Sequence, residues 1–213
     1  MQETYNYCMG RRGEVVACAL FAGECWGAVP TNELGTHGAP VQLRLDTANV
    51  ILPDLDISKF GSPRMWVDAK TKTRFFIWRK THRKQTGIEA RHLEHYRRME
   101  LLTGAPVVLC MIDCETGDVL CNTLSGLGEP RYSPADEYPL ANWDRDRFYR
   151  LWTVNPKRLN NLVKRETLPP PISKDVLRRT LDYLRPRKGE QSELPLFHSD
   201  VFAECTRLSA GRC

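Results

Sequence analysis

The sequence predicts an α/β protein with a mixed central sheet, and three observations support this. Apolar residues recur at helical spacing over 13–27, and strand patterns follow between 41 and 78. A second helical pattern covers 86–103. The continuous apolar run at 106–112 comes directly after it and is typical of a buried strand. The predicted order is helix, three strands, helix and strand, with short connections.

The first helix and the strands after it are predicted from apolar spacing. One helical face collects five apolar side chains, and Gly27 is a suitable stop: Val15, Cys18, Ala19, Ala22 and Trp26. Residues 41–57 indicate two short strands around a turn at 46–49. Residues 64–70 indicate a third strand, and 74–78 a fourth strand or its extension.

A basic loop and a second helix complete the first half of the chain. Residues 79–87 are polar and basic, and Thr86 or Gly87 is predicted to open a helix that ends near Thr103. Gly104 is a C-terminal stop signal. The first domain is therefore expected to span 1–115.

The second half is predicted to be a mostly helical C-terminal extension over 116–185. Gly, Pro and Asp make 113–142 loop-like, and short helices are expected at 145–152 and 156–163. Ser173 caps a clearer helix over 173–184. The tail, 186–213, has weak periodicity, which is typical of partial disorder.

Length and composition exclude several classes of protein. The chain has 213 residues, of which 41% are hydrophobic and 27% charged, so wholesale disorder is excluded. No run approaches about 18 uninterrupted apolar residues, which argues against a membrane-spanning helix. The N-terminus lacks the basic and apolar regions of a secretory signal. A cytoplasmic location is therefore expected.

The eight cysteines are predicted to be thiols without a metal. They include no CxxC pair, which is the usual mark of a zinc site. Cys110, Cys114 and Cys121 form the only loose cluster. The simplest interpretation is that they are small buried apolar side chains.

A charged constellation in the centre of the chain indicates chemistry. Asp68 and Lys70 are two residues apart on a predicted strand, so their side chains share a face. Asp54 precedes them by a turn and can meet them on an adjacent strand, with Asp56 as the alternative carboxylate. Two carboxylates at one point are suited to Mg²⁺ or Mn²⁺. The alternatives are a turn role for Asp54 and a solvated pair of Asp68 with Lys70.

These residues resemble the signature of the PD-(D/E)xK nuclease superfamily. Pro53 and Asp54 match the first half of the signature, and Asp68, Ala69 and Lys70 match the second half. The resemblance covers about 10–115 and implies a restriction-endonuclease-like αβββαβ core. It also implies metal-dependent hydrolysis of phosphodiester bonds in DNA. Asp54 and Asp68 would hold Mg²⁺ or Mn²⁺, and Lys70 would position the attacking water.

The two helices supply further candidate residues under the same resemblance. Glu14 lies in the first helix, where the family commonly carries a metal-site glutamate; first-turn acidity is the alternative. His92 and Tyr96 lie on the second helix, where one branch of the family has a Gln-x-x-x-Tyr pattern. His92 departs from that pattern, and both side chains could instead be ordinary core residues.

The distribution of charge favours a nucleic-acid partner. The total is 31 basic minus 26 acidic residues, or +5, but residues 70–98 hold ten Lys and Arg against two Glu, or +8. Four basic candidates for DNA contact lie in the loop: Arg79, Lys80, Arg83 and Lys84. RNA is not excluded, and a homodimer is left open. The rival classes are a non-catalytic nucleic-acid-binding protein on this fold and a basic protein-interaction or inhibitor module.

Overall fold

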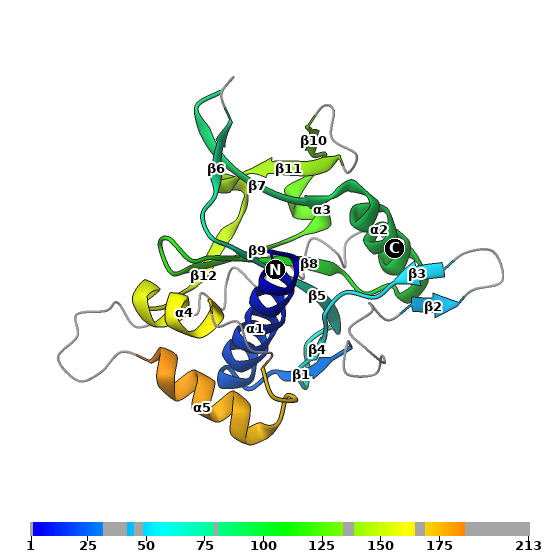
Figure 1. Cartoon of the computed structure of the whole chain (residues 1–213). Helices are drawn as coiled ribbons and strands as arrows, with labels where there is room; N and C mark the ends of the chain where they lie inside the picture. The colour runs from blue at the N-terminus through cyan, green and yellow to red at the C-terminus, as the bar shows by residue number, and fades with distance from the viewer. Residues whose placement is uncertain are drawn as a thin grey trace.

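The computed structural model describes residues 2–31, 42–44, 49–78, 81–133, 139–164 and 169–185. Its centre is a six-stranded sheet in the order β1-β4-β5-β8-β9-β12 (Figure 1). The strands of this sheet have the following bounds: β1 Gly27–Pro30, β4 Leu55–Ser58, β5 Met65–Lys72, β8 Val107–Asp113, β9 Asp118–Thr123 and β12 Tyr149–Thr153.

The sheet is mixed, as the sequence predicts. β1, β4 and β5 pair antiparallel in sequence, and β5 then pairs parallel with β8. A parallel neighbour requires a crossover, and the crossover includes helix α2 (Ala90–Thr103). Helix α1 (Gln2–Gly23) precedes β1, so the predicted αβββαβ order of a restriction-endonuclease-like core is confirmed.

Side-chain alternation along the central strands gives the sheet two buried faces. Val67 and Cys110 belong to one apolar cluster, which α1, α4 (Pro156–Val163) and α5 (Lys174–Leu184) cover. Trp66, Leu109 and Met111 belong to a second cluster that includes residues of α2. Every residue of β8 is buried, as expected for a strand in the middle of such a sandwich.

A second sheet of four strands lies beyond the α2 side of the first (Figure 1). Its order is β10-β11-β7-β6, and the bounds are β6 Phe76–Trp78, β7 Arg83–Glu89, β10 Arg131–Tyr132 and β11 Leu140–Asp144. The short helix α3 (Leu124–Leu127) and the 3-10 helix η2 (Arg145–Arg147) join its strands to the central sheet. A separate two-stranded sheet is formed by β2 (Gln42–Arg44) and β3 (Asn49–Ile51).

Two of the core strands are not those that the sequence pattern indicates. Within 41–57, β2 and β3 pair with each other outside the central sheet, whereas β4, which begins at Leu55, pairs with β1 and β5. The first core strands are instead β1 and β4. The first helix also stops earlier than predicted, at Gly23, because Cys25 adopts a positive φ of 62° and turns the chain into β1.

The basic loop predicted at 79–87 is partly a strand, because β7 begins at Arg83. Helix α2 accordingly begins at Ala90 rather than at Thr86 or Gly87. Thr86 and Gly87 pair with Trp143 and Asn142 of β11. Any side chain at Gly87 would overlap the backbone of β11, so this glycine permits close strand approach rather than starting a helix.

The C-terminal part contributes strands as well as helices. The helices expected at 156–163 and 173–184 are present as α4 and α5, and Ser173 Oγ accepts from the backbone N–H of Val176. Residues 113–142 contain strands rather than only loops, and 145–152 form η2 and β12 instead of a short helix. β9 and β12 extend the central sheet past residue 115, so the sheet has no boundary there. The tail, 186–213, lies outside the described residues.

Helix α1 lies closely against β5. A side chain added at Gly13 would overlap Thr71 Oγ1, so the glycine sets the distance between helix and strand. Within the part of the chain that the structure describes, no helix has the length and apolar character to cross a membrane.

Candidate functional site

The candidate site lies where β4 and β5 separate. Their pairing starts at Ile57 with Met65 and ends at Leu55 with Val67. Beyond this point a side chain replaces the backbone partner of β5: Asp54 Oδ2 accepts a hydrogen bond of 2.9 Å from the backbone N–H of Ala69. The side chain of Asp54 is thereby fixed at the edge of β5, beside Asp68 and Lys70.

Lys70 connects the two predicted carboxylates. Its Nζ lies 2.6 Å from Asp68 Oδ1 and 3.5 Å from Asp54 Oδ2. Burial opposes the charge of Lys70, but the negative charges of Asp54 and Asp68 outweigh burial and raise its pKa above the usual value. Lys70 is therefore a protonated donor at neutral pH. The three residues that the sequence analysis groups together thus meet at one point on the sheet.

Helix α2 packs over the site and supplies a hydrogen bond to Asp68. The hydroxyl of Tyr96, which is 1% exposed, donates to Asp68 Oδ1 over 2.5 Å. Burial, together with the charges of Asp68 and Asp54, raises the pKa of Tyr96 well above its usual value, so the hydroxyl remains a donor. His92 Nδ1 lies 3.3 Å from the same hydroxyl. Both predicted side chains of α2 therefore face the site.

His92 is neutral at physiological pH. Burial first, and then the positive charge of Lys70, lower the pKa of His92 to about 4. A neutral imidazole contributes no positive charge toward a phosphate. His92 is therefore not suited to attract DNA by charge, which limits the DNA contact that the sequence predicts for it to hydrogen bonding or packing.

Glu14 lies close to the site without joining a cluster of three ligands. It is buried on α1 and forms an ion pair with Arg11. Its negative charge helps to raise the pKa of both Lys70 and Tyr96. Among the described residues, no three His, Cys, Asp or Glu side chains converge as a group that could hold a metal ion.

Asp56, the alternative carboxylate, is occupied elsewhere. Arg64 donates to both of its oxygens, from Nε to Oδ1 over 2.8 Å and from Nη2 to Oδ2 over 2.6 Å. The guanidinium of Arg64 also stacks 4.5 Å from the ring centroid of Trp66. Asp56 therefore serves as an ion-pair partner at the start of the hairpin, and Asp54 is the carboxylate that reaches the site.

The residues at this point are suited to a hard divalent cation. Asp68 is fully buried, and its Oδ2 has no hydrogen-bond partner among the described residues. A buried carboxylate oxygen without a donor is costly unless a cation takes its lone pairs. Mg²⁺ commonly uses one or two protein carboxylates and completes its shell with water and phosphate oxygens. Asp54 and Asp68 supply such a pair.

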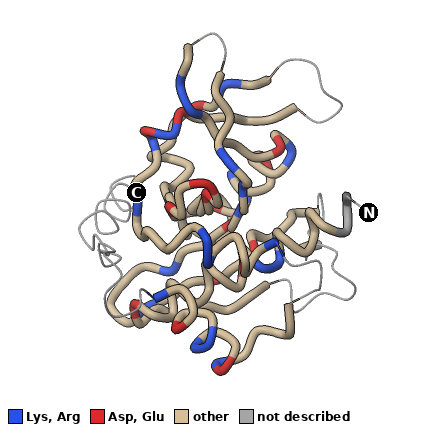
Figure 2. Tube along the Cα trace, turned by 60° about the vertical axis from the view of Figure 1, so that its left-hand side comes forward, with Lys and Arg blue, Asp and Glu red and all other residues tan. Residues whose placement is uncertain are grey.

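The predicted basic contacts lie partly outside the described residues, as Arg79 and Lys80 do. Arg83 lies on β7, 3.4 Å from Asp144 Oδ2, and Lys84 lies 3.4 Å from Glu115 Oε2. Lys and Arg positions occur along the second sheet, with Asp and Glu positions among them (Figure 2). Acidic neighbours therefore partly neutralise both described residues of this group.

Two residues that lie beside the site are not predicted as site residues from the sequence. Lys72 continues the face of β5 that bears Asp68 and Lys70, and Glu89 ends β7 at the start of α2. The charge of Glu89 acts on both Lys72 and His92. The alternation of 68, 70 and 72 could have identified Lys72. Glu89 depends on β7 folding over the central sheet, which no local pattern shows.

The cysteine cluster is apolar, as predicted. Cys110 and Cys121 are partners across β8 and β9, and both side chains are buried. Burial raises the pKa of the Cys114 thiol to about 11. All three side chains belong to the apolar cluster under α1.

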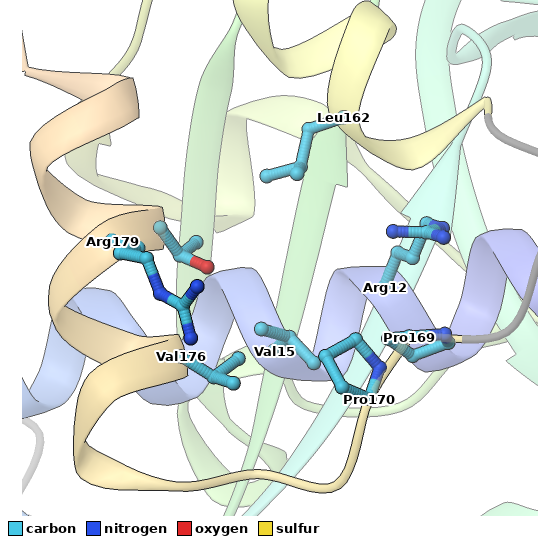
Figure 3. Close-up of a pocket in the computed structure, with 8 residues that line it drawn as sticks. Arg12, Val15, Leu162, Pro169, Pro170, Val176 and Arg179 are labelled. Atoms are coloured by element: carbon cyan, nitrogen blue, oxygen red, sulfur yellow. The ribbon is translucent and has the colours of Figure 1, made fainter.

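A separate hollow of about 210 Å³ lies between α1, α4 and α5 (Figure 3). Val15, Leu162 and Val176 give it an apolar lining, and the guanidinium of Arg179 is at its side. No carboxylate lines it. Neither Asp54, Asp68 nor Lys70 lines it, so it is separate from the candidate site.

The αβββαβ order of elements is that of a restriction-endonuclease-like fold, and Asp54 is held against Asp68 and Lys70 where β4 and β5 separate. No protein-family model and no curated protein matches the chain. Among solved structures, it is similar to Hjc, a Holliday junction resolvase from the archaeon Archaeoglobus fulgidus, with 13% identity and a TM-score of 0.44 over 65% of this chain and 91% of that one. It is also similar to D212, a nuclease from a fusselovirus, with 10% identity and a TM-score of 0.35 over 71% of this chain and 86% of that one.

Proposed function

We propose that the protein is a divalent-metal-dependent nuclease that hydrolyses phosphodiester bonds in DNA. The main support is the meeting of Asp54, Asp68 and Lys70 at the separation of β4 and β5. The buried Asp68 Oδ2, which has no donor among the described residues, is the oxygen that a cation would bind. Mg²⁺ or Mn²⁺ is the proposed cofactor.

In this proposal each side chain has a separate task. A bound Mg²⁺ would lower the pKa of a water and polarise the phosphodiester. Asp54 and Asp68 hold the ion, and Glu14 assists through its charge from α1. Tyr96 fixes Asp68 by donating to Oδ1, which leaves Oδ2 for the ion. Lys70, whose Nζ lies beside both carboxylates, would donate to the attacking water or to a phosphoryl oxygen.

The proposed DNA surface includes the predicted basic residues Arg79, Lys80, Arg83 and Lys84, with His92 and Tyr96 at its inner edge. The concentration of charge over 70–98 supports this assignment. Because His92 is neutral, its part would be contact or hydrogen bonding rather than charge attraction.

A non-catalytic nucleic-acid-binding protein on the same fold is the second candidate. One observation favours it: Lys70 already contacts both Asp54 and Asp68, so an internal cation balances part of their charge. In that case nucleic acid would bind without any dependence on a divalent metal.

The test uses the full chain with labelled single-stranded, duplex and branched DNA, in Mg²⁺, Mn²⁺, Ca²⁺ or EDTA. Cleavage should require Mg²⁺ or Mn²⁺, and Asp68→Asn and Lys70→Met should abolish it. Asp56→Asn is the matched control, because Asp56 pairs with Arg64 away from the site and should leave cleavage unchanged.

The outcomes separate the candidates. Tight, salt-sensitive binding without cleavage under any metal would favour the non-catalytic binder. No binding to any nucleic acid would leave a protein-interaction module as the better interpretation of the basic surface.

A further inference from the structure

Lys72 lies on the site face and forms no hydrogen bond or ion pair with any described residue, although the charges of Asp68 and Glu89 act on it from a greater distance. It ends β5, and strand alternation places its side chain on the same side as Asp68 and Lys70. It is half-buried, and none of the described residues offers its Nζ a hydrogen bond or an ion pair. Its neighbour across the parallel pair, Asp113, is engaged in its own turn, where it accepts from Glu115 N and Thr116 Oγ1.

Each carboxylate near Lys72 has another cationic side chain in closer contact. Asp54 and Asp68 contact Lys70, Glu14 pairs with Arg11, and Glu89 pairs with Arg91 over 2.6 Å: these are the ion pairs that surround the site. A half-buried ammonium without a counter-ion is costly to the fold. Burial and the repulsion of Lys70 accordingly lower the pKa of Lys72. An anion placed against Lys72 would remove that cost.

We propose that Lys72 binds the phosphate group next to the one that the site cleaves. This inference rests on the proposed nuclease function and adds a residue that positions the nucleic-acid strand. Lys70 and Lys72 are alternate residues of a strand, so their Cα atoms are separated by roughly 6.5 Å. Successive phosphates of one nucleic-acid strand are spaced on the same scale, so a strand running along β5 would bring one phosphate to each lysine.

The first test measures binding with Ca²⁺ in place of Mg²⁺, using a labelled oligonucleotide across a range of salt. Lys72→Met should weaken binding and reduce the slope of log K against log salt by about 0.7–0.9, the value for one lost phosphate contact. Lys72→Arg should restore the slope. Lys157→Met, which removes an exposed lysine on α4, should leave it unchanged.

A second test needs no catalysis. Acetic anhydride labels accessible neutral amines, and mass spectrometry locates the labelled lysines. Bound oligonucleotide should protect Lys72 from labelling in wild-type protein and leave Lys157 labelled. Far-UV circular dichroism should show that Lys72→Met is folded, because Met has a similar length and replaces an unpartnered charge.

Kinetics then separates this inference from the nuclease proposal. Lys72→Met should raise KM with little change in kcat, since a neighbouring phosphate is held equally in the ground and transition states. Lys70→Met should instead lower kcat. An unchanged salt slope and an unprotected Lys72 would overturn the inference even if the wild type cleaves DNA. If the wild type binds DNA but does not cleave it, the nuclease proposal is wrong, and the salt slope and the labelling still decide whether Lys72 binds a phosphate. If the wild type binds no nucleic acid, both the nuclease proposal and the role of Lys72 are wrong.

Discussion

At the scale of single residues, Asp68 is the centre of the site. It is fully buried and receives hydrogen bonds from Lys70 and Tyr96 on the same oxygen, Oδ1. Hydrogen bonds to a charged group are stronger than those between neutral groups. Asp68 is therefore held in one orientation by two elements, β5 and α2, and its second oxygen, Oδ2, has no hydrogen-bond partner among the described residues.

Tyr96→Phe should expose this dependence. Loss of the donor to a buried carboxylate should lower the free energy of unfolding by about 1.5–3 kcal/mol, measured by urea unfolding at neutral pH. Tyr132→Phe is the control, because Tyr132 is 53% exposed. In an Asp68→Asn background, Tyr96→Phe should lower the free energy of unfolding by less, because the carboxylate to which the hydroxyl donates has lost its charge. Equal effects in both backgrounds would contradict the role assigned to Tyr96.

His92 should make stability depend on pH. Its pKa is about 4 in the folded protein and about 6.5 in the unfolded chain. The unfolded state therefore binds more protons between these values, so stability falls as pH decreases from about 7 to about 4. At pH 5, the lowered pKa of His92 should reduce the free energy of unfolding by up to about 2 kcal/mol relative to neutral pH.

His92→Asn should remove that part of the acid sensitivity. The measurement is the difference in urea midpoint between pH 7 and pH 5, compared with wild type and with His82→Asn, because His82 is exposed on the turn before β7. A wild-type difference that persists in His92→Asn would show that other groups cause it.

At the scale of elements, the distance between α1 and β5 decides where Glu14 lies. Gly13 meets Thr71 of β5 without room for a side chain, and Glu14 is the next residue. The glycine thus allows the helix to come close enough for the charge of Glu14 to act on Lys70. A wider spacing would weaken that interaction.

A pair of alanine substitutions tests this packing. Gly13→Ala should destabilise the protein by about 1–3 kcal/mol, because the new methyl group overlaps Thr71 Oγ1. Gly10→Ala has open space and should stabilise α1 by up to about 1 kcal/mol. Both are measured as urea midpoints. Stabilisation by Gly13→Ala would mean that helix and strand are not in close contact.

The sequence predicts those parts of the site that depend on local pattern. Strand alternation places Asp68 and Lys70 on one face, and helical spacing places His92 and Tyr96 together. The sequence does not distinguish Asp54 from Asp56, because the difference comes from Arg64, which pairs with Asp56 across the hairpin. Arg64 is eight residues from Asp56, and the pattern of apolar residues does not show that the two side chains pair.

The missed strands follow from non-local pairing. Thr86 and Gly87 resemble a helix start, yet β11, more than fifty residues later, takes them into a sheet. β9 and β12 are likewise separated in sequence by the second sheet. Local patterns report which face of a segment is apolar, but the partner strand is set by the packing of the whole chain.

At the scale of the whole molecule, the central sheet needs both halves of the chain. β8 is buried on both faces, and β9 pairs with it along five residue pairs. Leu151 and Trp152 of β12 then belong to the same apolar cluster as α1. The region after residue 115 is therefore part of the folding unit that holds the site.

Truncation after residue 115 should consequently prevent folding. Removal of β9 and β12 would leave an edge of β8 unpaired and expose the apolar cluster beneath α1. Circular dichroism and urea unfolding should show no cooperative transition for residues 1–115. Truncation after 185 removes only the tail and is the matched control, with a transition near that of the full chain. A cooperative transition for 1–115 would show that the core folds by itself.

The separation of β4 and β5 gives the protein an internal reporter. The N–H of Ala69 is bonded to a side chain, Asp54 Oδ2, where a neighbouring strand would normally supply a carbonyl oxygen. Any ligand that draws the Asp54 carboxylate away releases this one amide. The rate at which the Ala69 amide proton exchanges with water is thus tied to the occupancy of the site, and it can be followed at a single backbone resonance without substrate turnover.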